Sequence, residues 1–351
     1  MQLSLESFTV TKRVALTISR GTTAQSTNVW LRLRHDGIEG WGEASPFSVG
    51  QRQTSQTAIA AITQIAPSLA HLSPFDIQQI QQHLKGLPSA AYAALDMALH
   101  DWIGKALKVP LWKLWGGDRH GIVPTSFTIG ISTPEKAQAR VRLWTEQVSA
   151  SDFKAVKVKL GSPEGIAADQ AMFEAVQDQV PDGASISVDA NGGWTSADAL
   201  SMASWLADRG VVYLEQPLPH GQESDLALLY ERSPLPIMAD ESCFTSRDIP
   251  LLATRVHGIN IKLMKSGGLS EALRMVHTAQ AHGLKIMFGC YSDSALSNAA
   301  AAQLAPFADY LDLDSHLNLI DDPFTGAALN AGRPWPSDAP GLGVRRTDAE
   351  V

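Results

Sequence analysis

The chain has 351 residues, of which 44% are hydrophobic and 18% are charged, and its formal net charge is −8. This length suffices for a barrel-sized domain and one smaller domain, and the composition is typical of a soluble globular protein. The acidic balance argues against nucleic acid or an anionic membrane surface as a partner, because both require a basic face.

The N-terminus and the cysteines predict a cytoplasmic protein. The first residues lack a basic segment followed by an apolar run, and no apolar stretch has the length of a membrane span. The two cysteines, Cys243 and Cys290, are too few for a disulfide framework and suit a reducing compartment. The expected partners are a small-molecule substrate and further copies of the chain in a homo-oligomer.

Residues 1–120 are predicted to form an α+β domain. Apolar alternation predicts antiparallel strands at 14–18 and 29–33, joined by a polar, flexible loop at 19–28. Helical periodicity runs from residue 54 to 115. A second polar loop lies at 45–53, and we expect both loops to cover an active site, select the substrate and exclude water.

Residues 121–322 are predicted to form a (β/α) barrel of the modified TIM type, which the first domain caps. Strands recur at intervals of about 25 residues with helical patterns between them, as in a parallel barrel. The Pro- and Gly-rich remainder, 323–351, is expected to return to the capping domain. The eight strands are expected at 125–130, 154–160, 184–190, 211–216, 235–241, 257–263, 284–290 and 309–315.

Three carboxylates end successive strands of the predicted barrel: Asp189, Glu215 and Asp240. The C-terminal ends of barrel strands meet at one face, where such enzymes keep their active sites. Three like charges cannot lie together without a cation. Oxygen ligands with room for water suit Mg²⁺, with Mn²⁺ also possible.

Lysines are expected to flank this metal from opposite sides of the barrel. Lys159 lies on the second strand and Lys262 on the sixth, and Lys157 shares a face with Lys159. A lysine becomes a base when a cationic neighbour or a metal lowers its pKa. One lysine would remove the α-proton of a metal-bound carboxylate substrate, and the other would return a proton on the opposite face of a metal-stabilised enediolate. This arrangement predicts racemisation or epimerisation by 1,1-proton transfer.

Six short motifs, distributed over most of the chain, resemble the enolase superfamily and, within it, the muconate lactonizing enzyme subgroup. The resemblance implies that Asp189, Glu215 and Asp240 bind the metal and that Lys159 and Lys262 form the acid/base pair. Lys157 and Lys265 would support them. The motifs are Gly-Trp-Gly-Glu-Ala at 40–44, Lys-Val-Lys at 157–159, Val-Asp-Ala-Asn-Gly-Gly-Trp at 188–194, Glu-Gln-Pro at 215–217, Ala-Asp-Glu-Ser at 239–242 and Asn-Ile-Lys-Leu-Met-Lys-Ser-Gly-Gly at 260–268.

The strand at 309–315 indicates the substrate class. Asp312 and Asp314 lie on one face and look like the Asp-x-Asp pair with which dipeptide epimerases hold the α-ammonium group of the substrate. A cationic amino terminus needs an anionic partner, which these carboxylates would supply opposite the metal-bound carboxylate. Thr128 resembles the family's threonine near the substrate. Arg20 resembles the arginine that binds the γ-carboxylate in L-Ala-D/L-Glu epimerases.

The predicted seventh strand departs from the family pattern in its last residues. Tyr291 and Ser292 replace apolar residues there, and Asp293 stands where a longer acid is usual, so all three are candidates for substrate selection. We expect a Mg²⁺-dependent dipeptide epimerase that acts on the α-carbon of the C-terminal residue, with an acidic residue at that position. The alternatives are an N-acylamino acid racemase or o-succinylbenzoate synthase, a muconate cycloisomerase, and a catalytically silent barrel that only binds a metal-chelated ligand.

Overall fold

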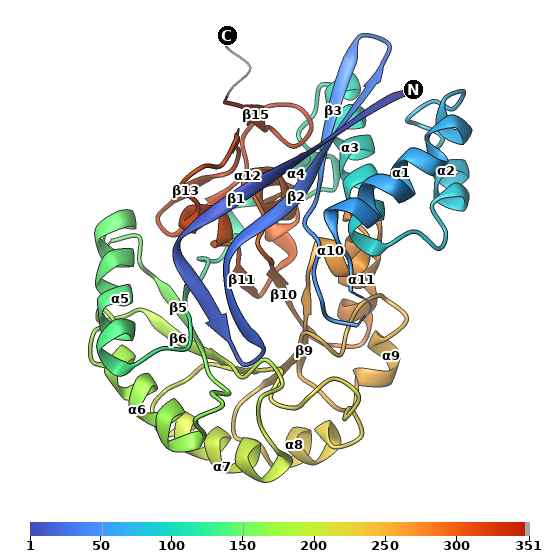
Figure 1. Cartoon of the computed structure of the whole chain (residues 1–351). Coiled ribbons are helices and arrows are strands. Elements are labelled where there is room, and N and C mark those ends of the chain that lie inside the picture. The colour runs from blue at the N-terminus through green and yellow to red at the C-terminus, as the bar shows by residue number, and fades with distance from the viewer. Residues whose placement is uncertain (51, 150, 348–351) are drawn as a thin grey trace.

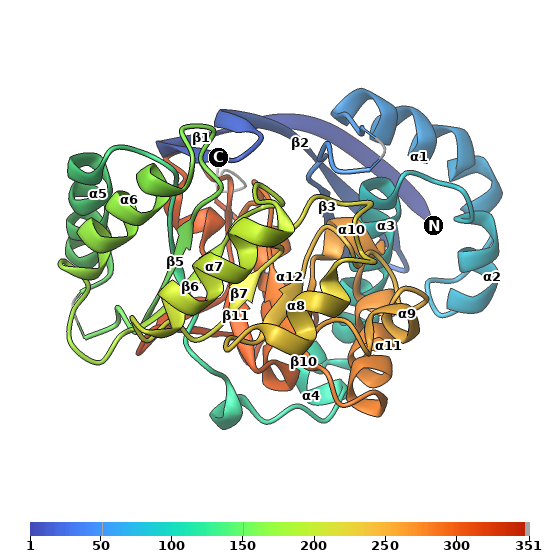
Figure 2. The same ribbon diagram turned by 90° about the horizontal axis from the view of Figure 1, so that it is seen from below.

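The computed structural model describes residues 1–50, 52–149 and 151–347, so Gln51 of the predicted 45–53 loop lies outside it. A barrel of parallel strands is surrounded by helices, and a separate sheet and helices lie over one end of it (Figures 1 and 2). The predicted fold, a (β/α) barrel with an N-terminal capping domain, is confirmed. None of the described helices combines the length and the apolar character needed to span a membrane.

The capping domain begins with a three-stranded antiparallel sheet of β1 (Gln2–Ile18), β2 (Gly21–His35) and β3 (Ile38–Ala44). The prediction of a flexible loop over 19–28 was wrong, because only Ser19 and Arg20 lie between β1 and β2. Threonine hydroxyl pairs between the two strands, such as Thr17 with Thr22 at 2.8 Å, join these polar stretches. β-branched polar residues suit a strand exposed to water, and polarity alone therefore did not indicate a loop.

Helix α3 of this domain packs against β3 at the two glycines of that strand. A Cβ atom at Gly40 or Gly42 would clash with backbone atoms of α3, so only glycine permits this close approach. The helices of the domain are α1 (Ser55–Leu69), α2 (Ile77–His83), α3 (Ser89–Leu107) and α4 (Leu111–Leu114).

The barrel strands follow one another in chain order around the sheet, and all are parallel. Ser126 closes the ring by donating its backbone N–H to the carbonyl of Leu311, at 2.9 Å. All eight predicted strands are present, each shorter than predicted. They are β4 (Phe127–Ile129), β5 (Ala155–Lys159), β6 (Ser185–Asp189), β7 (Leu214–Glu215), β8 (Ile237–Ala239), β9 (Gly258–Ile261), β10 (Lys285–Gly289) and β11 (Tyr310–Asp312).

Helices follow the first seven of these strands and surround the barrel (Figure 2). Their buried apolar residues belong to the main hydrophobic core. Tyr213, Met238 and Met287 form a small apolar cluster that is separate from this core. The helices are α5 (Pro134–Val148), α6 (Ile166–Gln177), α7 (Ser196–Ala207), α8 (Leu226–Arg232), α9 (Ile249–Leu252), α10 (Leu263–Ser266), α11 (Leu269–Ala281) and α12 (Ala295–Ala302).

Two buried acids of the capping domain bind the N-termini of barrel helices. Glu43 accepts hydrogen bonds from the backbone N–H groups of Ser294 and Ser297, at the start of α12. Asp96 accepts one from the N–H of Ser270 in α11, at 2.9 Å. Helix N-termini expose unpaired N–H groups and carry partial positive charge, so these acids join the two domains.

The C-terminal segment also contacts the capping domain. The ring of Phe324 packs edge-on against those of Phe8 and Trp41, at centroid distances of 6.4 and 5.6 Å. Asp101 of α3 accepts a hydrogen bond from the N–H of Leu342. The segment contains four short strands, β12 (Phe324–Thr325), β13 (Ala328–Asn330), β14 (Arg333–Trp335) and β15 (Arg345–Arg346).

Candidate active site

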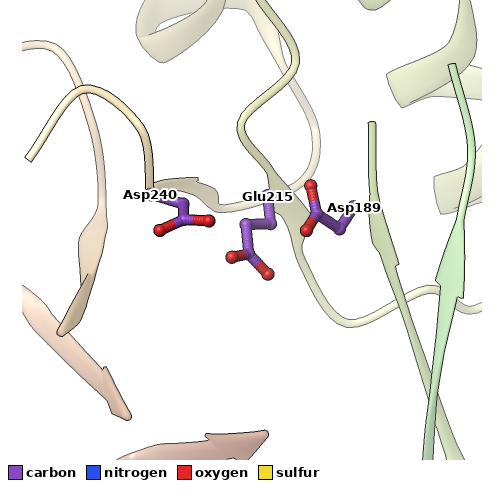
Figure 3. Close-up of side chains that lie close together, drawn as sticks. All are labelled: Asp189, Glu215 and Asp240. Carbon is purple, nitrogen blue, oxygen red and sulfur yellow. The ribbon is translucent and has the colours of Figure 1, made fainter. Parts of the chain in front are cut away.

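Asp189, Glu215 and Asp240 converge at the capped end of the barrel (Figure 3). Asp189 and Glu215 end β6 and β7, and Asp240 directly follows β8. Each offers a carboxylate oxygen within 4.8 Å of the others, and all three side chains are buried. Successive parallel strands thus bring together three residues that are about 25 positions apart in the sequence.

This cluster fits Mg²⁺. It offers only carboxylate oxygens, the ligands that hard divalent cations prefer, and it lies where charge of the same sign needs compensation. Among the residues that the structure describes, no other group of three acidic, histidine or cysteine side chains converges in this way. Neutral donors already orient two of the acids: the Asn260 amide donates to Glu215 at 2.6 Å, and the Asn191 amide donates to Asp189 at 2.9 Å.

Lys159 and Lys262 approach the cluster from opposite walls of the barrel, four strands apart in the sheet. The ammonium group of Lys159 lies 2.6 Å from Asp189, and that of Lys262 lies 2.8 Å from Asp240. Burial favours the neutral form of both lysines, but the adjacent carboxylates outweigh it and raise both pKa values. Both ammonium groups therefore form ion pairs with carboxylates of the cluster.

Lys157 and Lys265 are held more deeply than the first two lysines. Lys157 is fully buried and bridges Glu215, at 2.6 Å, and Asp312, at 2.8 Å. Lys265 comes from α10, beyond the strand, and lies 2.6 Å from Asp240. Every carboxylate of the cluster is consequently paired with at least one lysine.

Asp312 and Asp314 meet Thr128 on the far side of the barrel mouth. The hydroxyl of Thr128 lies 3.4 Å from Asp312 and 3.3 Å from Asp314, and its N–H donates to Asp314 at 2.7 Å. Burial opposes ionisation of Asp312, but the charge of Lys157 lowers its pKa to about 2. Burial and the charge of Asp312 raise the pKa of Asp314 to about 6. Asp314 is thus the acid whose charge is not already matched by a lysine.

Arg20 lies at the tip of the β1–β2 hairpin, where it contacts barrel residues. Its guanidinium group lies 2.6 Å from Glu241 and donates to the backbone carbonyl of Asn191 at 2.7 Å. We did not predict roles for Asn191 and Glu241, although both lie in quoted motifs next to metal-site acids. Their position in the sequence could have indicated a role, because Asn191 lies two residues after Asp189 and Glu241 lies one residue after Asp240.

Tyr291, Ser292 and Asp293, which follow Cys290 after the end of β10, have different surroundings. The Tyr291 ring stacks on Phe47 of the capping domain at 4.7 Å and lies 4.6 Å from the ammonium group of Lys262. The hydroxyl of Ser292 accepts a hydrogen bond from Lys12 at 2.8 Å. The Asp293 side chain is buried, and its Oδ1 has no hydrogen-bond partner among the described residues.

A cavity of about 710 Å³ extends from Lys159 to Asp314. Among the described residues, Lys262, Ser292, Asp293 and the three cluster carboxylates do not line it. Lys159, Tyr291, Thr128, Asp312 and Asp314 line it on the barrel side. It extends between the end of β1 and helices α5 and α6, where Lys12 and Arg140 contribute to its wall. Neither cation was predicted, because each lies in a segment without a recognisable motif.

Comparisons with known proteins agree with this geometry over the whole chain. Residues 4–116 match the family model "Mandelate racemase / muconate lactonizing enzyme, N-terminal domain", and residues 138–350 match "Enolase C-terminal domain-like". A hydrophobic dipeptide epimerase of Flavobacteria bacterium (strain MS024-2A) is 44% identical, with 98% of each chain covered. An L-Ala-D/L-Glu epimerase of Bacteroides thetaiotaomicron is 35% identical, over 99% of this chain and 88% of the relative.

A solved structure extends the comparison to three dimensions. The dipeptide epimerase of Enterococcus faecalis, complexed with Mg and the dipeptide L-Leu-L-Tyr, superimposes with a TM-score of 0.89. The two proteins are 30% identical, and the match covers 98% of this chain and 99% of the other. The chain belongs to the mandelate racemase/muconate lactonizing enzyme family of the enolase superfamily, as its motifs predicted.

Proposed function

We propose that this protein is a Mg²⁺-dependent dipeptide epimerase, which inverts the α-carbon of the C-terminal residue of its substrate. One observation supports this most directly: the same cavity reaches both Lys159, next to the carboxylate cluster, and Asp314, at the opposite rim. A dipeptide carries a carboxylate at one end and an ammonium group at the other, so its two charged ends match the two ends of this site.

The proposed metal ligands are Asp189, Glu215 and Asp240, which would hold the ion against the substrate carboxylate. When bound, Mg²⁺ supplies positive charge that stabilises the carboxylate as the α-proton leaves and favours the neutral form of a nearby lysine. Lys157 would support this arrangement, because its ammonium group ties Glu215 to Asp312 and thereby fixes the distance between the two ends of the site.

Lys159 and Lys262 would carry out the proton transfer. Because they approach from opposite walls of the barrel, the α-carbon would have one lysine on each face. The neutral lysine removes the α-proton, and the ammonium group of the other donates a proton to the opposite face, which inverts the configuration. Lys265 would hold Asp240 in place, since its ammonium group also donates to the backbone carbonyl of Asn260 at 3.0 Å.

Asp312 and Asp314 would bind the α-ammonium group of the dipeptide, with Thr128 orienting both carboxylates. N-acylamino acids, o-succinylbenzoate precursors and muconates carry no ammonium group, so they would leave Asp314 buried without a cationic ligand. The Asp pair therefore favours dipeptides over these three alternatives. A silent barrel that only binds metal chelates would not need a lysine on each side of the α-carbon.

We infer that the second residue of the substrate is uncharged rather than acidic. Arg20, which we had expected to bind an acidic side chain, is engaged by Glu241 and by the carbonyl of Asn191. An acidic substrate side chain would have to compete with Glu241 for this guanidinium group. Tyr291 presents an aromatic surface to the cavity, which suits an apolar side chain, and the 44%-identical relative is named a hydrophobic dipeptide epimerase.

Deuterium incorporation tests the proposal. The protein would be incubated in D₂O with Mg²⁺ and pools of L-Ala-L-Xaa dipeptides, alongside N-succinyl amino acids, and analysed by mass spectrometry. We expect a gain of one deuteron in dipeptides, with apolar Xaa labelled faster than Glu. Label confined to the N-succinyl pool would contradict the role of Asp314, and no label in any pool would favour the silent barrel.

A homo-oligomer and a cytoplasmic location remain predictions. Light scattering coupled to size-exclusion chromatography would test the first of these, and fractionation of the source cells would test the second.

A further inference from the structure

Two cations of the cavity wall have no role in the proposed reaction. Lys12 comes from β1, at the point where the pairing of β1 with β2 is interrupted between Thr11 and Leu16. Arg140 comes from α5, on the other side of the cavity. Lys12 is 7% exposed and Arg140 is 8% exposed, so both charges are nearly excluded from bulk water.

Neither cation has the partner that a buried charge normally has. The ammonium group of Lys12 donates to the neutral hydroxyl of Ser292, and no carboxylate of the described residues forms an ion pair with it. The guanidinium of Arg140 stacks on Trp144, at 4.0 Å from its centroid. Its Nη1 is buried and has no hydrogen-bond partner in the described part of the chain.

Such burial is costly unless a ligand supplies acceptors. It lowers the pKa of Lys12, and it lowers that of Arg140 to about 10, which shows that burial outweighs the local negative charge for both groups. The carboxylate of Asp314 attracts both cations, so all three charges lie around one region of the cavity. A ligand that pairs all three charges needs an ammonium group for Asp314 and, close to it, a hydrogen-bond acceptor for Lys12 and Arg140.

We propose that Lys12 and Arg140 bind the side chain of the first residue of the dipeptide, and that they select an acidic first residue. This inference rests on the proposed function. With the ammonium group at Asp314 and the reacting α-carbon at Lys159, the side chain of the first residue begins beside Asp314, next to the two cations. A carboxylate there gives both of them a charged acceptor, whereas an amide gives them a neutral one.

Apolar residues of the same cavity wall could contact the methylene groups of a glutamate side chain. Leu16 and Leu143 line the cavity together with the ring of Trp144. They would pack against the methylene groups of a glutamate side chain, while its carboxylate lies between Lys12 and Arg140. L-Glu is therefore the expected best first residue, followed by L-Gln, with apolar first residues weaker.

The test keeps the second residue constant and varies the first. Values of kcat/KM would be measured for L-Glu-L-Leu, L-Gln-L-Leu, L-Leu-L-Leu and L-Ala-L-Leu with the wild-type protein and with Arg140→Met, Arg140→Lys and Lys12→Met. The control is Arg142→Met, a cation of the same helix that donates to Gln179 outside the cavity. Thermal unfolding of each variant would verify that it is folded.

We expect wild-type protein to prefer L-Glu-L-Leu over L-Leu-L-Leu at least tenfold. Arg140→Met and Lys12→Met should each reduce this preference at least tenfold. Arg140→Lys should retain part of it, and Arg142→Met should leave it unchanged. An equal loss for all four dipeptides would overturn the proposal, because it would mean that the cations hold the peptide group common to all substrates.

The failure of this inference differs from the failure of the proposed function. L-Ala-L-Leu has no first side chain long enough to reach the cations, so its turnover tests the epimerase activity alone. Turnover of L-Ala-L-Leu without any preference for L-Glu-L-Leu would overturn only the assignment of Lys12 and Arg140. Absence of turnover with every dipeptide would overturn the proposed function, and this assignment with it.

Discussion

Arg20 of the capping domain and Glu241 of the barrel form an ion pair across the barrel mouth, at 2.6 Å. Glu241 directly follows the metal-site residue Asp240, and Asn191, whose carbonyl also accepts from Arg20, binds Asp189 through its side chain. Ser19 adds a hydrogen bond from its hydroxyl to the same carbonyl. The hairpin tip is thus fastened to the segments that follow β6 and β8, next to Asp189 and Asp240, two of the proposed metal ligands.

Replacing Arg20 by methionine should therefore weaken turnover of every dipeptide. Without the ion pair the hairpin tip is held less firmly, water enters the site more easily, and kcat/KM should fall about tenfold or more for L-Ala-L-Leu and L-Ala-L-Glu alike. Steady-state kinetics with both substrates measures the effect, and Glu241→Gln should reproduce it. A loss confined to L-Ala-L-Glu would instead show that Arg20 binds the substrate carboxylate.

The sequence predicted the barrel and its charged centre because both depend on short-range patterns. Alternating apolar residues mark each strand, and Asp189, Glu215 and Asp240 each follow such a run. Parallel strands then bring their C-terminal ends together whatever the details of the helices. The order and type of the strands, and the convergence of these acids, follow from that rule.

Other features depend on contacts between distant segments, which sequence patterns do not contain. The residues 21–28 are polar, yet they pair with β1 and belong to a strand. The ion pair of Arg20 joins positions that are 221 residues apart, and Lys12 reaches Ser292 across 280 residues. No local signal distinguishes such a cation from a solvated one, so only the fold shows that Lys12 and Arg140 share a cavity.

Single replacements of Lys159 and Lys262 should have different effects on exchange of the substrate α-proton. Lys159→Ala and Lys262→Ala should each reduce epimerisation at least 10³-fold, because inversion needs a proton group on both faces of the α-carbon. Each variant retains one lysine, which can still exchange the α-proton on its own face. Exchange in D₂O should therefore persist with one epimer of the dipeptide in Lys159→Ala and with the other in Lys262→Ala.

Nuclear magnetic resonance of L-Ala-L-Leu and L-Ala-D-Leu in D₂O would follow this exchange. The double variant Lys159→Ala/Lys262→Ala serves as the control, because it should exchange neither epimer. Exchange of both epimers by one single variant would contradict the assignment of one lysine to each face.

Binding of Mg²⁺ should stabilise the folded protein. A ligand that binds only the native state at a hundred times its Kd adds about 2.7 kcal/mol to the free energy of unfolding. Thermal unfolding with EDTA and with increasing Mg²⁺ should show a rising Tm, and EDTA should abolish turnover reversibly. Asp189→Asn should lose most of the Tm increase, whereas Asp312→Asn, outside the carboxylate cluster, should keep it. A similar Tm increase in the Asp189 variant would place the ion elsewhere.

Asp314 should make dipeptide binding sensitive to pH near 6. Burial and the charge of Asp312 raise its pKa to about 6, so the side chain is ionised at neutral pH and becomes protonated as the pH falls through this value. The substrate ammonium group, with a pKa near 8, stays charged over the same range. The attraction between the two is therefore present above pH 6 and is lost below it, and KM for L-Ala-L-Leu should rise about tenfold per pH unit well below 6.

Asp314→Asn isolates this contribution, because asparagine carries no charge at any pH. The variant should show a high KM throughout, and the ratio of the wild-type to the variant kcat/KM should decline from pH 7.5 to pH 5. Taking the ratio removes the titration of groups that both proteins share, including the lysines. A ratio that stays constant over this range would contradict the role of Asp314, since the ammonium group would then have another partner.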